Sequence, residues 1–411
     1  AEVEEEQTDE LPALGTPTLG DYQPKPLFDF STCLWCGRCQ EVCPATQTKK
    51  SLSPKGVMLT LAEMLESGKM DDAGMIDNVG METLFECRTC GACVEVCPAM
   101  TNPLKAMWNM RQNLMMERGE MPAHMLPAYR NMEALMHPFE SSASPSDWRE
   151  GLEVPEFKPG ETEYLLWIGC AVTYEDRAQK IGRAVVKILN QVGLSYGIIE
   201  DARCTGDPAK QMGDDYLFSM MAGANIDLFN DHGVQKIITM CPHCFNSFTK
   251  YYPPLGAEYE VIPHARLLNE LIEGGKVDLG KNSEKIAYHD PCYLGRHNRI
   301  FEAPRNVIES VGVLTELPKN HGDSFCCGAG GGNYWNEEEG ERINYTRAQE
   351  AFDRGADKLV SACPFCLLML TDGMKMYTEE QTVFDIAELV AESLLPETEQ
   401  QDSSITQELK N

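Results

Sequence analysis

The sequence predicts an α+β chain in which a mainly helical N-terminal part precedes a duplicated α/β part with mostly parallel sheets. Two cysteine clusters, at 33–43 and 87–97, flank a segment whose apolar residues recur at helical spacing. From residue 164 onward, short apolar runs that suit buried strands alternate with amphipathic stretches. This alternation is typical of βα units, which assemble into parallel sheets.

The expected elements of the α/β part form two series. Strands are expected at 164–168, 198–199, 236–240 and 260–262, and again at 286–289, 314–317 and 358–361. Helices are expected at 178–192, 216–230, 265–272, 303–311, 338–354 and 386–394. In the N-terminal part, helical periodicity covers 54–67, 77–85 and 103–136.

The cysteines show that the two series are an internal repeat. Four cysteines of the first series recur 122 residues later, so that Cys170, Cys204, Cys241 and Cys244 correspond to Cys292, Cys326, Cys363 and Cys366. The fifth cysteine of the second series, Cys327, corresponds to Thr205. Equal spacing at five positions is hard to produce by chance, so the α/β part is predicted to be a duplication.

Composition divides the chain further. Residues 1–26 are acidic and then rich in Pro and Gly, and are expected to form a flexible arm. A helical domain is expected over 27–140, and a linker of Ser, Pro and charged residues over 141–160. The two repeats are assigned to 161–280 and 281–395, and a polar tail to 396–411.

Charge and hydropathy exclude several classes of function. The formal net charge of −29 would repel phosphate backbones and anionic bilayers, so nucleic acid is not an expected partner. No apolar run approaches the ~20 residues of a membrane-spanning helix, so no transmembrane segment is expected. The N-terminus lacks the basic start and apolar stretch of a signal peptide. We expect a cytoplasmic protein that reaches the cytoplasmic face of a membrane only through a partner subunit.

The 17 cysteines are the strongest functional signal, and the first eight share one spacing. Each N-terminal cluster reads C-x2-C-x2-C-x3-C-P, the ligand run of bacterial [4Fe–4S] ferredoxins, in which the fourth cysteine ligates the other cluster. Zinc knuckles or disulfides are the alternative, but zinc sites usually pair C-x2-C units across a longer gap. Two [4Fe–4S] cubanes are therefore expected, one held by Cys33, Cys36, Cys39 and Cys97 and the other by Cys87, Cys90, Cys93 and Cys43.

The separation of the two motifs bears on the fold of this domain. The 43 residues between Cys43 and Cys87 exceed the separation in a compact bacterial ferredoxin. The arrangement resembles the helical ferredoxin domains of fumarate-reductase-type iron–sulfur subunits. The N-terminal part is therefore expected to be a helical ferredoxin-like domain.

Three stretches of the second repeat carry a family resemblance: His289-Asp-Pro-Cys-Tyr-Leu-Gly-Arg296, Cys326-Cys-Gly-Ala-Gly-Gly-Gly332 and Ala362-Cys-Pro-Phe-Cys366. Over about residues 25–395 the chain resembles the CCG-domain iron–sulfur proteins. These include the catalytic subunit of heterodisulfide reductase, the iron–sulfur subunits of glycolate oxidase and anaerobic glycerol-3-phosphate dehydrogenase, and oxidoreductases linked to electron-transfer flavoprotein. The stretch Cys204-Thr-Gly-Asp-Pro208 looks most like the flavoprotein-linked branch.

The resemblance implies a noncubane [4Fe–4S] cluster that binds and cleaves a disulfide, held by Cys292, Cys326, Cys327, Cys363 and Cys366. Five thiolates exceed the four corners of a cubane, so an unusual cluster or a free reactive thiol is required. The first repeat keeps four cysteines, which suit an ordinary [4Fe–4S] cubane, although a metal-free degenerate half is the alternative. His289 and Asp290 are expected either to tune the second cluster or merely to cap a helix.

Two functions remain open. The favoured hypothesis is an electron-transfer oxidoreductase subunit, whose two cubanes pass electrons to or from the cluster of the second repeat. Its partner would be a flavoprotein, a hydrogenase-type subunit or a quinone-reactive membrane subunit. The alternative is a catalytic subunit in which the second-repeat cluster itself reduces a disulfide or heterodisulfide. A zinc-bound scaffold is a third and weaker interpretation.

Overall fold

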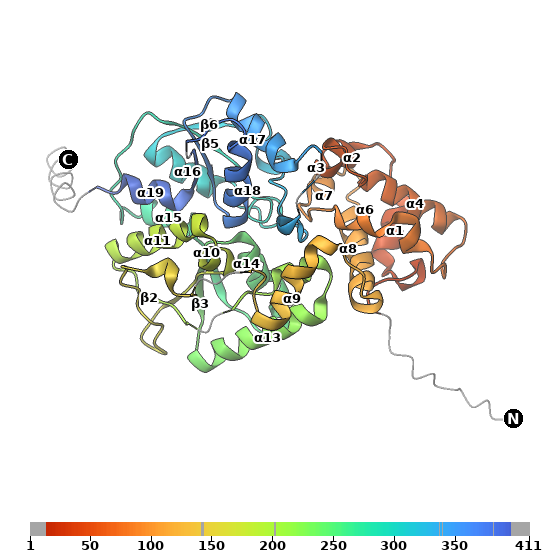
Figure 1. The fold of residues 1–411 in the computed structure, drawn as a ribbon, viewed down its shortest axis with the longest axis horizontal. Coiled ribbons are helices and arrows are strands. Elements are labelled where there is room, and N and C mark those ends of the chain that lie inside the picture. The colour runs from red at the N-terminus through yellow and green to blue at the C-terminus, as the bar shows by residue number, and fades with distance from the viewer. Residues whose placement is uncertain are drawn as a thin grey trace.

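A computed structural model of the chain describes residues 14–140, 144–200, 203–336, 338, 340–380 and 382–395. Three lobes are visible in Figure 1, with the N-terminal domain beside the two α/β repeats. The tail at 396–411 and residues 1–13 of the expected arm lie outside the described residues.

The N-terminal domain is helical, as expected. Its longer helices begin at a proline, a residue well suited to the first helical position: α1 (Pro24–Thr32), α4 (Pro54–Glu66) and α8 (Pro103–Asn113). The side chains of Ser53 and Asn102 cap α4 and α8 by accepting backbone N–H bonds. Shorter helices complete the domain: α2 (Arg38–Glu41), α3 (Pro44–Gln47), α5 (Met75–Val79), α6 (Met81–Phe85) and α7 (Ala92–Glu95).

The expected helix over 103–136 is interrupted. A π-helical turn at Leu114–Arg118 follows α8, and Gly119 then adopts a left-handed conformation with φ 63°. The chain resumes as α9 (Leu126–Leu135), which leaves the N-terminal domain and packs against the first repeat. Tyr129 of α9 donates a hydrogen bond from Oη to Asp214 Oδ2 at 2.8 Å.

Each repeat contains a four-stranded parallel sheet, and the strand order is the same in both. The first sheet has the order β2-β1-β3-β4, formed by Tyr196–Gly197, Tyr164–Trp167, Lys236–Thr239 and Glu260–Pro263. The second has the order β6-β5-β7-β8, formed by Val313–Glu316, Lys285–Tyr288, Lys358–Ser361 and Val383–Asp385. The predicted duplication of a parallel α/β unit is confirmed.

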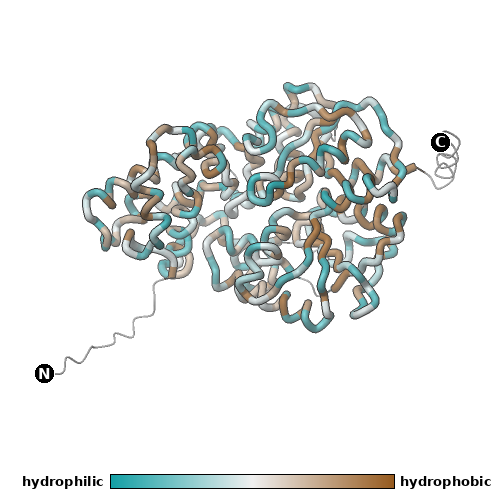
Figure 2. The backbone as a smooth tube through the Cα atoms, turned by 180° about the vertical axis from the view of Figure 1, so that it is seen from behind, coloured by the Kyte–Doolittle hydropathy of each residue, from teal (hydrophilic) through white to brown (hydrophobic). Residues whose placement is uncertain are grey.

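Helices surround these sheets, and Figure 2 shows apolar stretches running through the interior of both repeats. In the first repeat they are α10 (Cys170–Tyr174), α11 (Asp176–Gln191), α12 (Asp207–Met212), α13 (Asp215–His232), α14 (Pro242–Asn246) and α15 (His264–Glu273). In the second they are α16 (Glu302–Val311), α17 (Ile343–Asp353), α18 (Pro364–Met374) and α19 (Ile386–Ser393).

Two strand expectations were incomplete. The strand expected at 198–199 lies two residues earlier, and Ile198 instead forms an isolated bridge with Glu156. Strand β8 was missed because it is only three residues long and leads directly into α19.

Two segments that were expected to be loose are packed. Leu19 and Tyr22, within the expected arm, are buried, and Tyr22 Oη donates to the Ala106 carbonyl at 2.9 Å. Trp148 and Phe157, within the expected linker, are buried against the first repeat. Their proline- and charge-rich neighbours favoured loops, but the few apolar side chains among them have a core to enter.

Contacts between polar side chains join the two repeats. Arg177 of α11 donates two hydrogen bonds of 2.9 Å to the carboxylate of Glu388 on α19. His264 Nε2 lies 3.0 Å from Asp385 Oδ1 across the same interface. These buried pairs fix the relative orientation of the two sheets and so of the cysteines at their ends.

Candidate functional site

Each N-terminal cysteine motif folds as a tight loop followed by one turn of helix. Helix α2 follows Gly37 and α7 follows Gly91, and both glycines adopt left-handed conformations, with φ of 86° and 74°. Such a conformation strains residues with a Cβ, so glycine allows the sharp turn that gathers successive cysteines. Cys43 directly precedes α3, so the fourth thiol of the first motif lies beyond α2, at the start of the next helix.

The eight thiols of this domain form two groups. Burial and neighbouring thiolates raise the pKa of Cys39 to about 11, and these neighbours are Cys33, Cys97 and Cys36. Burial likewise raises the pKa of Cys93 well above its ordinary value, with contributions chiefly from Cys87, Cys90 and Cys43. The fourth cysteine of each motif therefore lies with the first three of the other motif.

In the second repeat, the cysteines follow the carboxyl ends of β5 and β7, the edge at which open α/β sheets gather ligands. Cys363 is the N-cap of α18, and Cys366 lies in the first turn of that helix. Burial opposes ionisation of Cys363, but hydrogen bonds from Cys241 and Cys366 lower its pKa to about 6. A thiolate at a helix N-terminus is also favoured by the helix dipole.

The imidazole of His289 lies next to these thiols. One donor atom from each of His289, Cys327 and Cys366 lies within 4.8 Å of the other two. Hydrogen bonds from Cys326 and Cys366 hold the pKa of Cys327 well below its ordinary value, and His289 adds to this effect. Arg347 Nε donates to His289 Nδ1 at 3.1 Å and so orients the ring.

Asp290 points elsewhere. Its carboxylate accepts two hydrogen bonds from Arg305, at 2.8 and 3.0 Å, and a third from the backbone N–H of His321 at 2.8 Å. From the sequence alone, His289 and Asp290 were equivalent candidates for tuning a cluster. The structure separates them, because only His289 faces the thiols.

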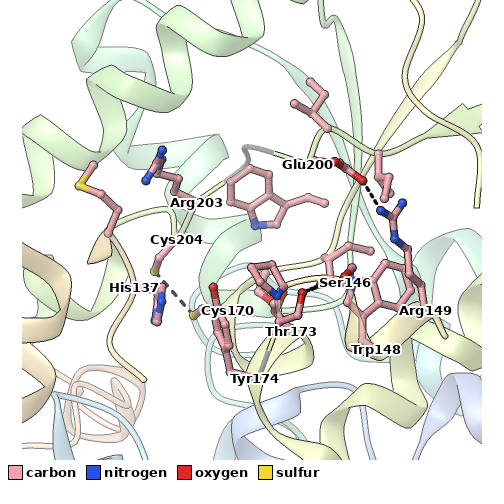
Figure 3. Close-up of a pocket in the computed structure, with 18 of the residues that line it drawn as sticks. His137, Ser146, Trp148, Arg149, Cys170, Thr173, Tyr174, Glu200, Arg203 and Cys204 are labelled. Atoms are coloured by element: carbon pink, nitrogen blue, oxygen red, sulfur yellow. Dashed lines mark hydrogen bonds and ion pairs between the residues drawn. The ribbon is translucent and has the colours of Figure 1, made fainter. Parts of the chain in front are cut away.

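The first repeat gathers four buried thiols in the corresponding position. Cys170 Sγ and Cys204 Sγ lie 3.7 Å apart (Figure 3). Cys241 is the N-cap of α14, and Cys244 lies in its first turn. The Thr205 hydroxyl, where the second repeat has Cys327, lies 3.9 Å from Cys244 Sγ. The hydroxyl thus occupies the place of a fifth thiol without supplying one.

A cleft of about 410 Å³ opens beside Cys170 and Cys204. His137, Tyr174 and Arg203 lie around it, and the ring of His137 stacks on that of Tyr174 at 4.1 Å (Figure 3). Burial and the nearby Arg203 lower the pKa of His137, although a hydrogen bond with the backbone of Phe139 opposes this shift.

The thiols of the two repeats face one another. Cys241 of the first repeat and Cys363 of the second interact through their side chains. Beside them, His243 stacks on Tyr293 with ring centroids 4.1 Å apart. His243 Nδ1 lies 3.0 Å from Asp207 Oδ2, and this carboxylate raises the pKa of His243 against the effect of burial.

The N-terminal domain meets the second repeat at its second cysteine motif. Cys90 packs in one buried cluster with Cys292 and Cys326, and the Cys326 side chain is the largest influence that raises the pKa of Cys90. Two glycines allow this approach: a Cβ on Gly330 would lie 2.1 Å from the Arg88 carbonyl oxygen. A Cβ on Gly331 would lie 2.1 Å from the Cys87 carbonyl oxygen. A side chain at either position would push the two modules apart.

Buried arginines surround these thiols and were not singled out in the sequence. They are Arg88, Arg111, Arg296 and Arg347. Burial lowers the pKa of Arg296, but thiolates at Cys90, Cys292 and Cys326 outweigh it and raise that pKa above its ordinary value. Arg296 Nε also donates to the Cys90 carbonyl at 2.7 Å. For Arg88, directly after Cys87, and Arg296, four residues after Cys292, nearness to a cysteine was the available signal; Arg111 and Arg347 have no cysteine close to them in the sequence.

Comparisons with known proteins agree with this geometry. A 4Fe–4S dicluster domain matches residues 25–98, and a cysteine-rich domain matches residues 164–249 and again 286–371. The EtfAB:quinone oxidoreductase of Syntrophomonas wolfei is 35% identical over 93% of this chain and 60% of its own length. The probable iron–sulfur-binding oxidoreductase FadF of Bacillus subtilis is 33% identical over 93% of this chain and 62% of its own.

A third relative is covered almost completely. It is a subunit of the dihydromethanophenazine:CoB–CoM heterodisulfide reductase of Methanosarcina barkeri, 30% identical over 93% of this chain and 98% of its own length. The chain spans only about 60% of the length of the first two relatives. Across the part of the chain that the structure describes, no helix is long and apolar enough to cross a bilayer.

Proposed function

Because the chain belongs to the heterodisulfide reductase-like iron–sulfur proteins with a duplicated cysteine-rich domain, we propose that it is the electron-transfer subunit of an oxidoreductase complex. Its N-terminal [4Fe–4S] clusters would exchange electrons, one at a time, with the cluster of the second repeat. The main support for this proposal is the packing of Cys90 against Cys326, because this contact brings a thiol of the N-terminal domain next to the thiols of the second repeat.

The thiol groupings support a specific set of ligands. We assign Cys33, Cys36, Cys39 and Cys97 to one cubane and Cys87, Cys90, Cys93 and Cys43 to the other, since these thiols adjoin one another. The domain fits such clusters because Gly37 and Gly91 allow the tight loops, and Cys33, Cys36, Cys39 and Cys97 line one small pocket.

The second repeat offers a different donor set. Five buried thiols and one imidazole converge there, more than a cubane can use, which favours a noncubane cluster held by Cys292, Cys326, Cys327, Cys363 and Cys366. In the first repeat, Cys170, Cys204, Cys241 and Cys244 provide the four thiols of an ordinary cubane, and Thr205 supplies no fifth.

The partner is a redox subunit: a flavoprotein, a hydrogenase-type protein or a quinone-reactive membrane subunit. The names of the relatives, one an EtfAB:quinone oxidoreductase and one a heterodisulfide reductase subunit, support this class. A quinone-reactive partner would hold the chain at the cytoplasmic face of the membrane. Disulfide cleavage by the second-repeat cluster is the weaker alternative, since Thr205 leaves only one five-thiol site.

The test is an anaerobic purification from the native cell, with iron, acid-labile sulfide and co-purifying redox proteins measured together. Four clusters predict about 16 iron atoms and as many sulfides per chain. Dithionite is expected to reduce all four, as followed by paramagnetic resonance. Protein that contains zinc and no labile sulfide would overturn the proposal. A paramagnetic signal that appears only with a thiol substrate and disappears in Cys327→Ser would favour the catalytic alternative.

A further inference from the structure

The two cysteine motifs of the N-terminal domain are themselves a structural repeat, 54 residues apart. Helices α2 and α7 keep this offset, and the chain around both reads Cys-Gly-x-Cys-x-Glu-Val-Cys-Pro-Ala. Trp35 and Thr89, at equivalent positions, both have positive φ, of 54° and 48°. A face of one motif can therefore be compared residue by residue with the same face of the other.

Equivalent faces of the two motifs have opposite surroundings. Arg88 and Thr89 of the second motif are 2% and 1% exposed. Leu34 and Trp35, their counterparts in the first motif, are 65% and 53% exposed. A Cβ on Gly91 would lie 3.3 Å from His297 Nε2, whereas no described atom would lie within 4 Å of one on the equivalent Gly37.

The buried face is where the second motif meets the next redox module. The Thr89 hydroxyl donates to Gln211 Oε1 at 2.9 Å and accepts from Tyr293 Oη at 3.2 Å. These contacts seat Cys90 beside Cys326 of the second repeat. The geometry of the motif thus brings a redox module against its thiols through this face.

The chemistry of the exposed face differs from that of the buried one. Leu34 and Trp35 replace the polar pair Arg88 and Thr89, and Met100, 81% exposed, lies on the loop that follows Cys97. Arg38 and Lys55, like Leu34 and Trp35, line the small pocket that also contains the thiols of Cys33, Cys36, Cys39 and Cys97. Cys36, in the middle of this face, is the one exposed cysteine of the 17, all of which the structure describes.

We propose that this outer face, formed by Leu34, Trp35, Cys36, Arg38, Lys55 and Met100, is the docking surface for a redox protein. The proposal rests on the electron-transfer function above and names the end of the chain at which the partner binds. The partner's electron carrier opens onto an apolar patch bordered by carboxylates, which would pair with Arg38 and Lys55.

Physical costs in the isolated chain support a bound partner. An exposed tryptophan leaves a large apolar area in water, next to the similarly exposed Leu34. Contact with an apolar partner removes the area from water, and aromatic residues at the centre of an interface commonly dominate binding. The two cations at the edge, Arg38 and Lys55, match an acidic rim on the partner.

The experiment places a photo-crosslinking amino acid, p-benzoylphenylalanine, at Met100 of the full-length chain in its native cells. Met376, 60% exposed on the second repeat, is the matched control position. Irradiation is expected to crosslink position 100 to a protein that carries flavin, haem or an iron–sulfur cluster. The same product should be absent from position 376.

The captured protein is then purified and used as electron donor in stopped-flow experiments. Met100→Glu and Trp35→Ala are expected to slow its reduction of the chain by about tenfold or more at subsaturating concentration, whereas Met376→Glu is not. Dithionite should reduce all these variants at the rate of the unchanged protein, with the same iron content. Failure of dithionite to reduce the unchanged protein would instead count against the proposed function itself.

Several results would overturn the docking surface. They are the absence of a crosslink at position 100, a crosslink to a second copy of the chain or to a protein without a redox group, and the same product at position 376. Equal rates of partner-driven reduction in Met100→Glu and Met376→Glu would also contradict it. Trp35 lies between two predicted cluster ligands, Cys33 and Cys36, so Trp35→Ala also tests the loop that holds them. Met100→Glu changes a residue outside that loop and keeps the test valid if the loop is disturbed.

Discussion

Gly331 carries the contact between the N-terminal domain and the second repeat, and its replacement by alanine tests that contact directly. The added methyl would start 2.1 Å from the Cys87 carbonyl oxygen and 3.1 Å from Arg111 Nη1. Neither atom can move freely, because the carbonyl is backbone and Arg111 is buried and donates to Gln211, Gly331 and Cys87 carbonyls. Gly331→Ala must therefore separate the two modules.

Gly331→Ala is destabilised by backbone strain and by overpacking, and an alanine variant at a second glycine separates these two costs. Gly331 has φ +69°, where an alanine is strained by roughly 1–2 kcal/mol. Gly355 has φ +66° and no described atom within 4 Å of an added Cβ, so Gly355→Ala has the backbone strain alone. Overpacking typically costs a further ~1–3 kcal/mol. Gly331→Ala is therefore expected to destabilise the protein by roughly 1–3 kcal/mol more than Gly355→Ala.

Anaerobic urea unfolding, followed by cluster absorbance, measures the difference in stability. Stopped-flow reduction with dithionite then compares how fast electrons reach the second repeat, and only Gly331→Ala should slow this step because it moves Cys90 away from Cys326. Equal unfolding midpoints and equal rates in the two variants would refute the idea that backbone contact at Gly331 holds the redox modules together.

Three further predictions concern single side chains. Cys36→Ser should remove the iron of one cluster and stop electron delivery while both α/β repeats stay folded; loss of far-ultraviolet dichroism across the chain would contradict this. Burial lowers the pKa of His297 to about 3, so its neutral form contributes stability above about pH 6.5 that is lost as the pH falls. His297→Gln should therefore reduce the change in the unfolding midpoint between pH 7 and pH 5, compared with a His232→Gln control. Thr205→Cys should give the first repeat a paramagnetic signal like that of the second; an unchanged signal would mean that a fifth thiol does not set the cluster type.

The sequence predicted those features that depend on local patterns. Strand β3 coincides with the apolar run expected at 236–240. Cys241 opens a helix directly after the strand, as the Cys-Pro-x-Cys spacing indicated. The repeat offset also aligned β3 with β7, because equal numbers of residues separate equivalent cysteines and strands. Such features follow from periodicity and from the residues that start helices.

Features that depend on tertiary contact were missed. Trp148 lies in a segment rich in Ser, Pro and charge, yet it packs against Gly182 of α11, where an added Cβ would lie 3.1 Å from the indole ring. Gly330 and Gly331 pack on the backbone of the N-terminal domain, a contact that their own sequence neighbourhood did not indicate. Composition describes a segment's own preferences and says nothing about the surface it meets.

The contacts between modules define a linear order. The first motif is exposed at Cys36, the second touches the second repeat through Cys90 and Cys326, and the second repeat touches the first through Cys363 and Cys241. The N-terminal part also contacts the first repeat, through Tyr129, Arg111 and Thr89 of the second motif, but these contacts are not made by thiols. In the proposed function, electrons that enter at the outer face must therefore pass the five-thiol site before they reach the four-thiol site. The unusual site then lies inside the path rather than at its end, which suits a relay better than a terminal catalyst.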